Sequence, residues 1–134
     1  ASHLSPTYDY GVTFERGVRA DFCGLAHTII SGTASIDNKG NVLHIGDVVS
    51  QTGRMFENIE VLLAEAGSGW ASIKQALVYL RNAEDYAAVA PLVSEKLGDI
   101  PYVITLAPVC RPDWLIEMEC IATPRRKNLQ YRDY

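Results

Sequence analysis

Two glutamates near the carboxyl end of the chain are the first residues whose types and spacing suggest chemistry. Glu117 and Glu119 lie two positions apart in the mostly apolar stretch 114–122, so on a strand both side chains would point to one face, about 7 Å apart. A carboxyl group half-buried there among apolar neighbours has a raised pKa and can serve as a general acid near neutral pH. Two other roles for Glu117, an ion pair with Arg81 or Arg111 and simple solvation, stay open at this point.

Two arginines are candidates for holding an anionic substrate near these glutamates. Arg81 ends the apolar stretch 73–81, and Arg111 stands before Pro112 in a turn. A guanidinium group in such a place binds a carboxylate through two parallel hydrogen bonds, although a solvated surface arginine is the commoner case. The sequence therefore predicts a small carboxylate-bearing metabolite as a partner, with Arg81 or Arg111 as its anchor.

A cysteine and a short polar motif complete the candidate site. Cys110 precedes Arg111, whose charge would lower the pKa of the thiol; the alternative is a small packed hydrophobic side chain. The tripeptide Ser31, Gly32 and Thr33 is expected to end a strand and to begin a turn whose backbone N–H groups face an anion. The same tripeptide is also common in ordinary turns.

The composition limits the fold and the partners. The chain has 134 residues, of which 48% are hydrophobic and 21% are charged, as in one globular domain. This domain is expected to span residues 12–124, between a loosely held N-terminal extension, 1–11, and a polar basic tail, 125–134. A net charge of -4 argues against nucleic acid as a partner.

Several absences in the sequence exclude further classes of protein. No apolar run approaches the roughly 20 residues that a membrane span needs, and no secretory leader is found. The 3 cysteines lack close spacing, which favours a reduced compartment, and a cytoplasmic protein without membrane contact is predicted. His27 and His44 have no ligand spacing and no nucleotide-binding motif is present, so neither a metal site nor a cofactor is predicted.

Hydrophobic periodicity predicts the elements that must position the candidate residues. Asp47 is the expected N-cap of a helix over 47–66, and Gly67 its stop. The expected strands are 12–16, 18–22, 25–31, 73–81, 102–107 and 114–122, with turns at Gly17, 23–24 and 37–41 and a second helix from 82 or 83 to 97. This order predicts an α+β domain with both helices on one face of a mixed sheet.

The periodicity also predicts which side chains are buried. The first helix is expected to bury one face, and the second helix a narrower stripe. For the first helix these residues are Val48, Val49, Thr52, Met55, Phe56, Ile59, Leu62, Leu63 and Ala66, and for the second Tyr86, Val89, Ala90, Val93 and Leu97.

Both faces of the predicted sheet are apolar. On the strand 73–81, Val78 and Leu80 share one face and Leu77 and Tyr79 share the other. Two helices can cover only one face, so the second face would be left against water unless another subunit covers it. A homo-oligomer is therefore expected.

Several stretches together resemble the Rid family, the reactive-intermediate deaminases that are also called endoribonuclease L-PSP. They are Ile30-Ser31-Gly32-Thr33, the helix 47–66 with its Ala64-Glu65-Ala66-Gly67 exit, Val78-Tyr79-Leu80 with Glu84-Asp85-Tyr86, and Ile116-Glu117-Met118-Glu119-Cys120-Ile121-Ala122. The resemblance implies a homotrimer with a chorismate-mutase-like fold and clefts between subunits.

The resemblance also implies an activity and its residues. Deaminase members hydrolyse enamines and imines derived from amino acids, and the family glutamate is retained as Glu117. The family arginine that holds the substrate carboxylate follows a proline; here Pro101 is followed by Tyr102 and the arginine's place falls on Val103. The family asparagine of the second helix falls on Ala90.

A closer likeness is to the carboxyl-terminal half of the chorismatases, which hydrolyse the enol-ether side chain of chorismate and release pyruvate. The similar stretches are Ser31-Gly32-Thr33-Ala34-Ser35-Ile36, His44-Ile45-Gly46-Asp47, Val78-Tyr79-Leu80-Arg81, Val109-Cys110-Arg111-Pro112-Asp113 and Leu115-Ile116-Glu117. The resemblance implies that Glu117 protonates the enol ether and that Cys110 lies in the pocket. Chorismatases carry a second Rid-like half, so neighbouring subunits would have to supply the missing wall.

Three functions remain open. The leading one is a hydrolase or lyase in which Glu117 is the general acid, Arg81 or Arg111 anchors a carboxylate, and water is the nucleophile. The second is a non-catalytic, ligand-binding or regulatory trimer, which Val103 and Ala90 would allow. The third, ribonuclease activity, is suggested only by the family's older label and is disfavoured by the acidic charge.

Overall fold

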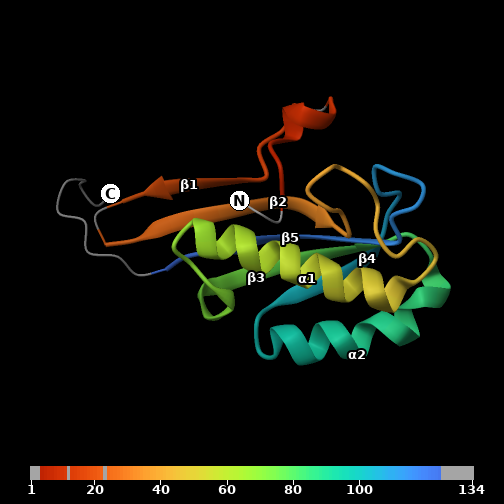
Figure 1. The fold of residues 1–134 in the computed structure, drawn as a ribbon. Coiled ribbons are helices and arrows are strands. Elements are labelled where there is room, and N and C mark those ends of the chain that lie inside the picture. The colour runs from red at the N-terminus through yellow and green to blue at the C-terminus, as the bar shows by residue number, and fades with distance from the viewer. Residues whose placement is uncertain (1–3, 12, 23, 125–134) are drawn as a thin grey trace.

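The computed structural model describes residues 4–11, 13–22 and 24–124. The predicted basic tail, Cys23 and residue 12 of the first predicted strand lie outside these residues. The fold consists of one mixed sheet and two helices, whose arrangement can be followed in Figure 1. The sheet order is β1-β2-β5-β3-β4, where the strands are β1 (Gly17–Asp21), β2 (Ala26–Ala34), β3 (Ile73–Leu80), β4 (Tyr102–Leu106) and β5 (Ile116–Ala122).

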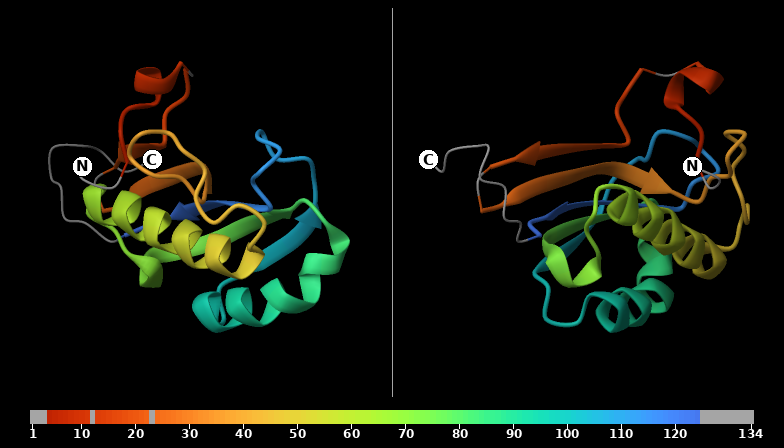
Figure 2. Two further views of the ribbon diagram at one scale, coloured as in Figure 1. Left: turned by 45° about the vertical axis from the view of Figure 1, so that its right-hand side comes forward. Right: turned by 60° about the vertical axis from the view of Figure 1, so that its left-hand side comes forward.

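Both helices pack on the same side of the sheet, which confirms the predicted α+β arrangement. They are α1 (Val48–Glu65) and α2 (Tyr86–Leu97), and 3-10 turns lie at Thr7–Tyr10, Trp70–Ser72 and Ala83–Asp85. The views in Figure 2 show α1 and α2 together beneath the strands. β3 pairs with β4 in parallel, and the other neighbouring strands are antiparallel.

Helix α1 begins and ends where its capping residues predict. The Asp47 carboxylate accepts a hydrogen bond from the Ser50 backbone N–H at 3.0 Å, which satisfies one of the unpaired donors of the first turn. Gly67 follows the helix with a φ of 68°, a left-handed conformation that glycine adopts without strain. The predicted buried face is confirmed except at Val49, which is 49% exposed, and at Ala66, which is only partly buried.

Helix α2 buries a narrower stripe than predicted. Val89, Val93 and Leu97 are buried, whereas Ala90 is only partly buried and Tyr86 is 55% exposed. Tyr86 is the first residue of the helix and lines a shallow groove with Leu106 of β4. Because β4 is an edge strand, no further strand covers this aromatic ring.

The N-terminal part of the fold differs from the prediction. Residues 13–16 form no strand, and Gly17 lies inside β1 rather than in a turn. A Cβ added at Gly17 would lie 3.0 Å from Ile30 Cδ1, so this glycine allows β1 to approach β2 closely. The segment before it is not loosely held throughout, because Leu4 is only 5% exposed and belongs to the core.

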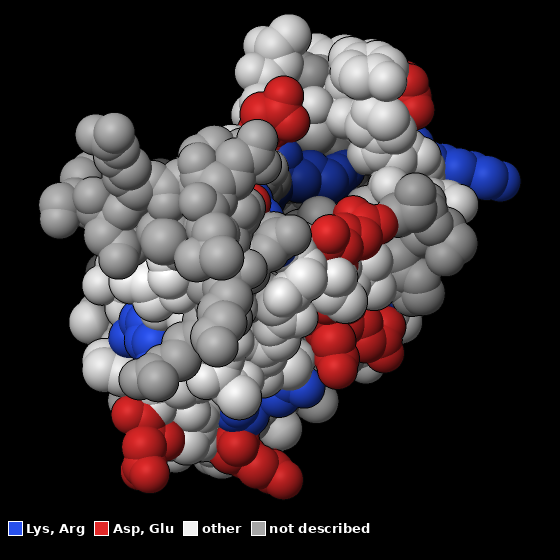
Figure 3. Space-filling model, turned by 90° about the vertical axis from the view of Figure 1, so that its left-hand side faces the viewer, with Lys and Arg blue, Asp and Glu red and all other residues white. Residues whose placement is uncertain are grey.

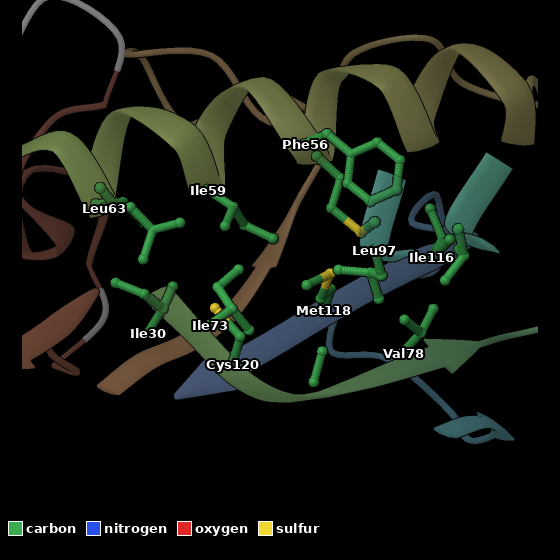
Figure 4. Close-up of a cluster of buried hydrophobic side chains, with 14 of the residues drawn as sticks. Ile30, Phe56, Ile59, Leu63, Ile73, Val78, Leu97, Ile116, Met118 and Cys120 are labelled. Carbon is green, nitrogen blue, oxygen red and sulfur yellow. The ribbon is translucent and has the colours of Figure 1, made fainter. Parts of the chain in front are cut away.

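The two faces of β5 divide as alternation predicts. Ile116, Met118 and Cys120 are buried beneath the helices, and Figure 4 shows their side chains in the cluster below α1 with Phe56 and Ile59. Burial of such large apolar side chains stabilises a fold by about 1.5–3 kcal/mol each.

Glu117 and Glu119 take the opposite side of the sheet, which we call the open face. Tyr79 of β3 lies in register with Glu117, and Leu77 lies in register with Glu119. Large apolar side chains are exposed on the open face at Val18 (51%), Ile29 (48%) and Val103 (57%). Among the described residues, neither helix has the length and apolarity needed to cross a membrane.

Candidate active site

A pocket of about 400 Å³ gathers six of the seven residues that were singled out from the sequence. It lies where the open face meets the loop 107–115, between β4 and β5. The six are Glu117, Cys110, Arg111, Ser31, Gly32 and Thr33, and the other lining residues are Phe14, Arg16, Ala34, Ile36 and Trp114. Arg81 is not among the lining residues.

Glu117 is the acidic residue of this pocket. It occupies the middle of the sheet, paired with Ala34 of β2 on one side and with Tyr79 of β3 on the other. Its Oε2 atom is buried and has no hydrogen-bond partner among the described residues. Burial raises the pKa of the Glu117 carboxyl, and the neighbouring charge of Glu119 raises it further. The carboxyl group therefore keeps its proton to a higher pH than an exposed glutamate does.

Glu119 lies on the same face of β5 but has a different environment. The Tyr79 hydroxyl donates a hydrogen bond to Glu119; burial first, and then this bond, raise the pKa of Tyr79. Two carboxyl groups on one strand face thus have unlike surroundings, one with an unpartnered buried oxygen and one with a phenol donor.

Arg111 brings positive charge to the pocket from the loop. Its guanidinium group lies 5.1 Å from the centre of the Trp114 ring, and its Nη1 donates to the Gly40 carbonyl oxygen at 2.6 Å. Stacking on an aromatic face and a backbone bond fix the direction of an arginine side chain. Arg111 is therefore placed to hold an anion in the same pocket as Glu117.

Arg81 does not line the pocket, but it forms hydrogen bonds with the backbone of the loop 107–115. Its Nε donates to the Trp114 carbonyl oxygen at 2.8 Å, and its Nη2 donates to the carbonyl oxygens of Val109 and Arg111 at 2.7 Å each. The Gln51 side chain adds two bonds, donating to the Asp113 carbonyl oxygen and accepting from the Leu115 N–H. These contacts fix the backbone around Cys110 and Arg111.

The Ser31-Gly32-Thr33 motif lines the pocket from inside β2, not from a turn at its end. The strand continues to Ala34 through a register shift between Ile30 and Thr33. The Ser31 N–H donates to the Arg16 carbonyl oxygen at 3.0 Å, and the Ser31 hydroxyl donates to that of Glu15 at 2.6 Å. The Ser31 N–H is therefore engaged with the preceding segment rather than directed at an anion.

Phe14 and Arg16 are pocket residues that the sequence analysis missed. The Arg16 guanidinium lies 6.0 Å from the Phe14 ring, and its Nε donates to the Ser5 carbonyl oxygen at 3.0 Å. Their alternation around Glu15 suggested a strand. The one available signal was an aromatic and a basic residue two positions apart, which does not by itself indicate a pocket.

A second hollow of about 540 Å³ lies beyond the same two residues. It is lined by Arg16, Arg19, Glu15 and Glu65 among others. Figure 3 shows basic side chains recessed between acidic ones at this end of the molecule. Phe14 and Arg16 line both this hollow and the pocket around Glu117.

The two described cysteines differ in their exposure to solvent. Cys110 is exposed at the pocket, whereas Cys120 is buried in the core. Burial, and next the charge of Glu119, raise the pKa of the Cys120 thiol to about 12. Within the described part of the chain no three His, Cys, Asp or Glu side chains come close enough to hold a metal ion.

Curated proteins provide similar sequences. A RutC family protein of Pyrococcus abyssi is 35% identical over 95 residues, which cover 69% of this chain and 75% of that protein. The 3-aminoacrylate deaminase RutC of Acinetobacter baylyi is 29% identical over 96 residues, with the same two coverages of 69% and 75%. The 3-hydroxybenzoate synthase of Streptomyces hygroscopicus is 34% identical over 100 residues, 67% of this chain but only 29% of that enzyme.

Solved structures confirm the fold. A crystal structure of a chorismatase superposes with a TM-score of 0.75 at 22% identity, over 81% of this chain and 36% of the chorismatase. The family model described as endoribonuclease L-PSP matches residues 24–124. The chain therefore belongs to the endoribonuclease L-PSP family, the Rid superfamily.

Proposed function

We propose that this protein is a hydrolase or lyase for a small metabolite that carries a carboxylate beside a reactive double bond. Glu117 is its general acid, Arg111 anchors the carboxylate, and water is the nucleophile. The double bond belongs to an enamine or imine, or to an enol ether. The pocket is one wall of a cleft that another subunit of a homotrimer completes.

One observation carries this proposal. Glu117 has a buried, unpartnered Oε2 in a pocket that it shares with the Arg111 guanidinium. A carboxylic acid with a raised pKa donates a proton at neutral pH, and a nearby guanidinium holds the substrate's own carboxylate. Acid-catalysed hydrolysis needs both a proton donor, which is Glu117, and a group that binds the substrate, which is Arg111.

Enamines and enol ethers share their first step. The Glu117 proton adds to the terminal carbon of the double bond, and the electron pair of that bond forms the new C–H bond. The adjacent carbon becomes an iminium or oxocarbenium centre, and the Glu117 carboxylate takes a proton from the water that adds there. Returning that proton to the nitrogen or oxygen breaks the C–N or C–O bond and releases an amine or an alcohol. The Glu117 carboxylate then takes the hydroxyl proton of the hydrated carbon, which leaves a 2-keto acid, so Glu117 ends protonated as it began.

The enol ether is favoured over the enamine by a residue outside the pocket. Val103 stands at the position of the arginine with which deaminase members of the family hold their substrate. It is apolar and 57% exposed on the open face. Arg111 comes from a different loop and would hold a carboxylate from another direction, so an ordinary deaminase substrate would lack its usual anchor.

Parallel assays distinguish the two chemistries. The purified protein is incubated with 2-aminoacrylate generated in place and, separately, with chorismate, and pyruvate release is followed in both. Glu117→Gln should lower the rate on the accepted substrate about 100-fold or more, the usual contribution of a positioned acid. Val49→Ala, on the outer side of α1, is the control. Wild-type rates in Glu117→Gln on a verified substrate would contradict the proposal.

A non-catalytic binding protein is the second candidate. Val103 and Ala90 both replace polar family residues, and neither side chain can hydrogen-bond a substrate. Such a protein would be stabilised against heat by small carboxylates without forming product. Product formation at enzymatic rates from any stabilising carboxylate would exclude this candidate.

A further inference from the structure

Gly32 lies at an irregularity of β2 that faces the candidate acid. Ile30 pairs with Cys120 and Thr33 pairs with Met118, so two residues of β2 stand opposite the single residue Glu119 of β5. This is the arrangement of a β-bulge, which redirects the backbone and the neighbouring side chains. The bulge brings the Gly32 backbone toward the side chain of Glu117.

The space beside Gly32 is filled by the Glu117 carboxyl group. A Cβ added at Gly32 would lie 2.9 Å from Glu117 Cδ and 3.4 Å from Cγ, and it would overlap Oε1. Gly32 is not one of the glycines with a positive φ. A glycine is therefore needed here for space and not for its backbone conformation.

Contact with Gly32 also limits the access of water to the carboxyl group. Oε1 lies against the β2 backbone, while Oε2 is buried without a hydrogen-bond partner among the described residues. We call the space between Gly32 and the Glu117 carboxyl group the Gly32 niche. A side chain at position 32 would push the carboxyl group out of this niche. The Glu117 carboxyl group would then be exposed to solvent, and its position relative to the substrate would change.

Charged and titratable groups surround the niche on three sides. Glu119 lies on the same strand, and Tyr79 faces Glu117 from β3. Arg111 and Cys110 line the pocket from the loop 107–115, and Arg16 lines it from the segment before β1. None of these groups is on β2 beside the carboxyl group, so the niche acts through shape and exclusion of water.

We propose that Gly32 is a positioning residue, whose missing side chain creates the niche that holds the Glu117 carboxyl group and directs its proton into the pocket. The catalytic consequence rests on the proposed role of Glu117. The contact itself does not, so it is testable without a substrate.

The first experiment measures the contact by a stability cycle. Gly32→Ala is made in the wild-type protein and in Glu117→Ala, and the thermal midpoint of each variant is recorded. Gly32→Ala should lower the midpoint strongly when Glu117 is present and much less when its side chain is absent. If Gly32→Ala alone does not fold while the double variant does, the contact is supported. An equal loss in both backgrounds would overturn the proposal.

The second experiment measures the acid itself. The Glu117 carboxyl carbon is titrated by NMR in wild-type protein and in Gly32→Ala; if Gly32→Ala does not fold, the stability cycle alone decides. The pKa should fall toward its ordinary value of 4.5 in the variant, and an unchanged pKa would overturn the proposal. Gly53→Ala is the matched control, because a Cβ on that glycine of α1 meets no atom within 4 Å.

Activity then separates this proposal from the proposed function. On a verified substrate, kcat/KM of Gly32→Ala should fall about 10-fold to 100-fold, as small displacements of catalytic groups do, and the acidic limb of its pH profile should shift with the NMR pKa. Gly53→Ala should keep the kcat/KM and the pH profile of the wild-type protein. If Glu117→Gln retains activity while the stability cycle still shows coupling, the general-acid role fails and the Gly32 niche stands.

Discussion

At the scale of the residue, the proton on Glu117 couples the pocket to the stability of the fold. Burial and Glu119 raise the folded-state pKa above the ordinary 4.5, so the folded state binds this proton more tightly than the unfolded state does. The contribution of such a group is fully favourable below the unfolded pKa. This contribution declines as the pH rises through the folded pKa, because the buried carboxyl group must then lose its proton.

Glu117→Gln should remove this pH dependence. The free energy of unfolding of the variant, relative to wild type, should increase as the pH rises from about 4 to about 8. Urea unfolding at a series of pH values measures both proteins. For the control Glu60→Gln, on the exposed side of α1, the free energy of unfolding should change with pH in parallel with that of wild type. A Glu117→Gln curve parallel to that of wild type would contradict the raised pKa of Glu117.

The two described cysteines give a second prediction at this scale. Cys110 is exposed, whereas the Cys120 thiol is buried and has a pKa of about 12. Only a thiolate reacts rapidly with a disulfide reagent. Cys110→Ser should therefore remove one fast-reacting thiol from the native protein, and Cys120→Ser should remove none. Reaction with Ellman's reagent, with and without denaturant, counts these thiols; loss of a fast thiol in Cys120→Ser would contradict the burial.

At the scale of the element, the backbone of the loop 107–115 is held by Arg81, the residue that follows β3. Arg81 gives three hydrogen bonds to loop carbonyl oxygens. Bonds from a charged donor are stronger than neutral ones, and a lost donor leaves its acceptors unpaired. Arg81 was expected as a carboxylate anchor. Its contacts are with the backbone of the loop, and we propose that it positions Arg111 for that task.

Arg81→Met should loosen this loop. We expect a loss of about 1–3 kcal/mol in the free energy of unfolding and a higher KM for a carboxylate substrate, because Arg111 is no longer held in place. The pH dependence of kcat should stay unchanged, since Glu117 lies on β5 outside the loop. Lys74→Met, an exposed cation on the same strand, is the control; an unchanged KM in Arg81→Met would contradict the positioning role.

At the scale of the whole molecule, the open face determines whether the proposed cleft exists. Val18, Ile29 and Val103 leave apolar surface on the side of the sheet that carries Glu117. Contiguous exposed apolar surface marks an interface in most proteins. We expect three copies to associate through this face and to complete the pocket.

Ile29→Lys should disrupt this association. Ile29 is 48% exposed on the open face, and Val49 is 49% exposed on α1, which packs on the other side of the sheet, so Val49→Lys is a closely matched control. Sedimentation should give three times the chain mass for wild type and Val49→Lys, and a smaller mass with loss of activity for Ile29→Lys. A monomeric wild type at micromolar concentration would contradict the trimer and the completed cleft.

Local periodicity determined a large part of this fold. The spacing of apolar residues around Asp47 and Gly67 predicts α1, and alternation along 114–122 places Glu117 and Met118 on opposite faces. Both patterns depend on the fixed geometry of a helix or a strand, where each side chain's direction follows from its position. The family resemblance that names Glu117 likewise lies in contiguous stretches of sequence.

Only the tertiary structure decided how the site is assembled. Phe14 and Arg16 reach the pocket because Leu4 is buried and the following segment packs against β2, and Arg81 turns toward the loop instead of the substrate side. The role of Gly32 depends on a bulge in the pairing of β2 with β5. These relations join residues far apart in the chain, and their distances depend on strand register and loop path, which no local pattern of residue types contains.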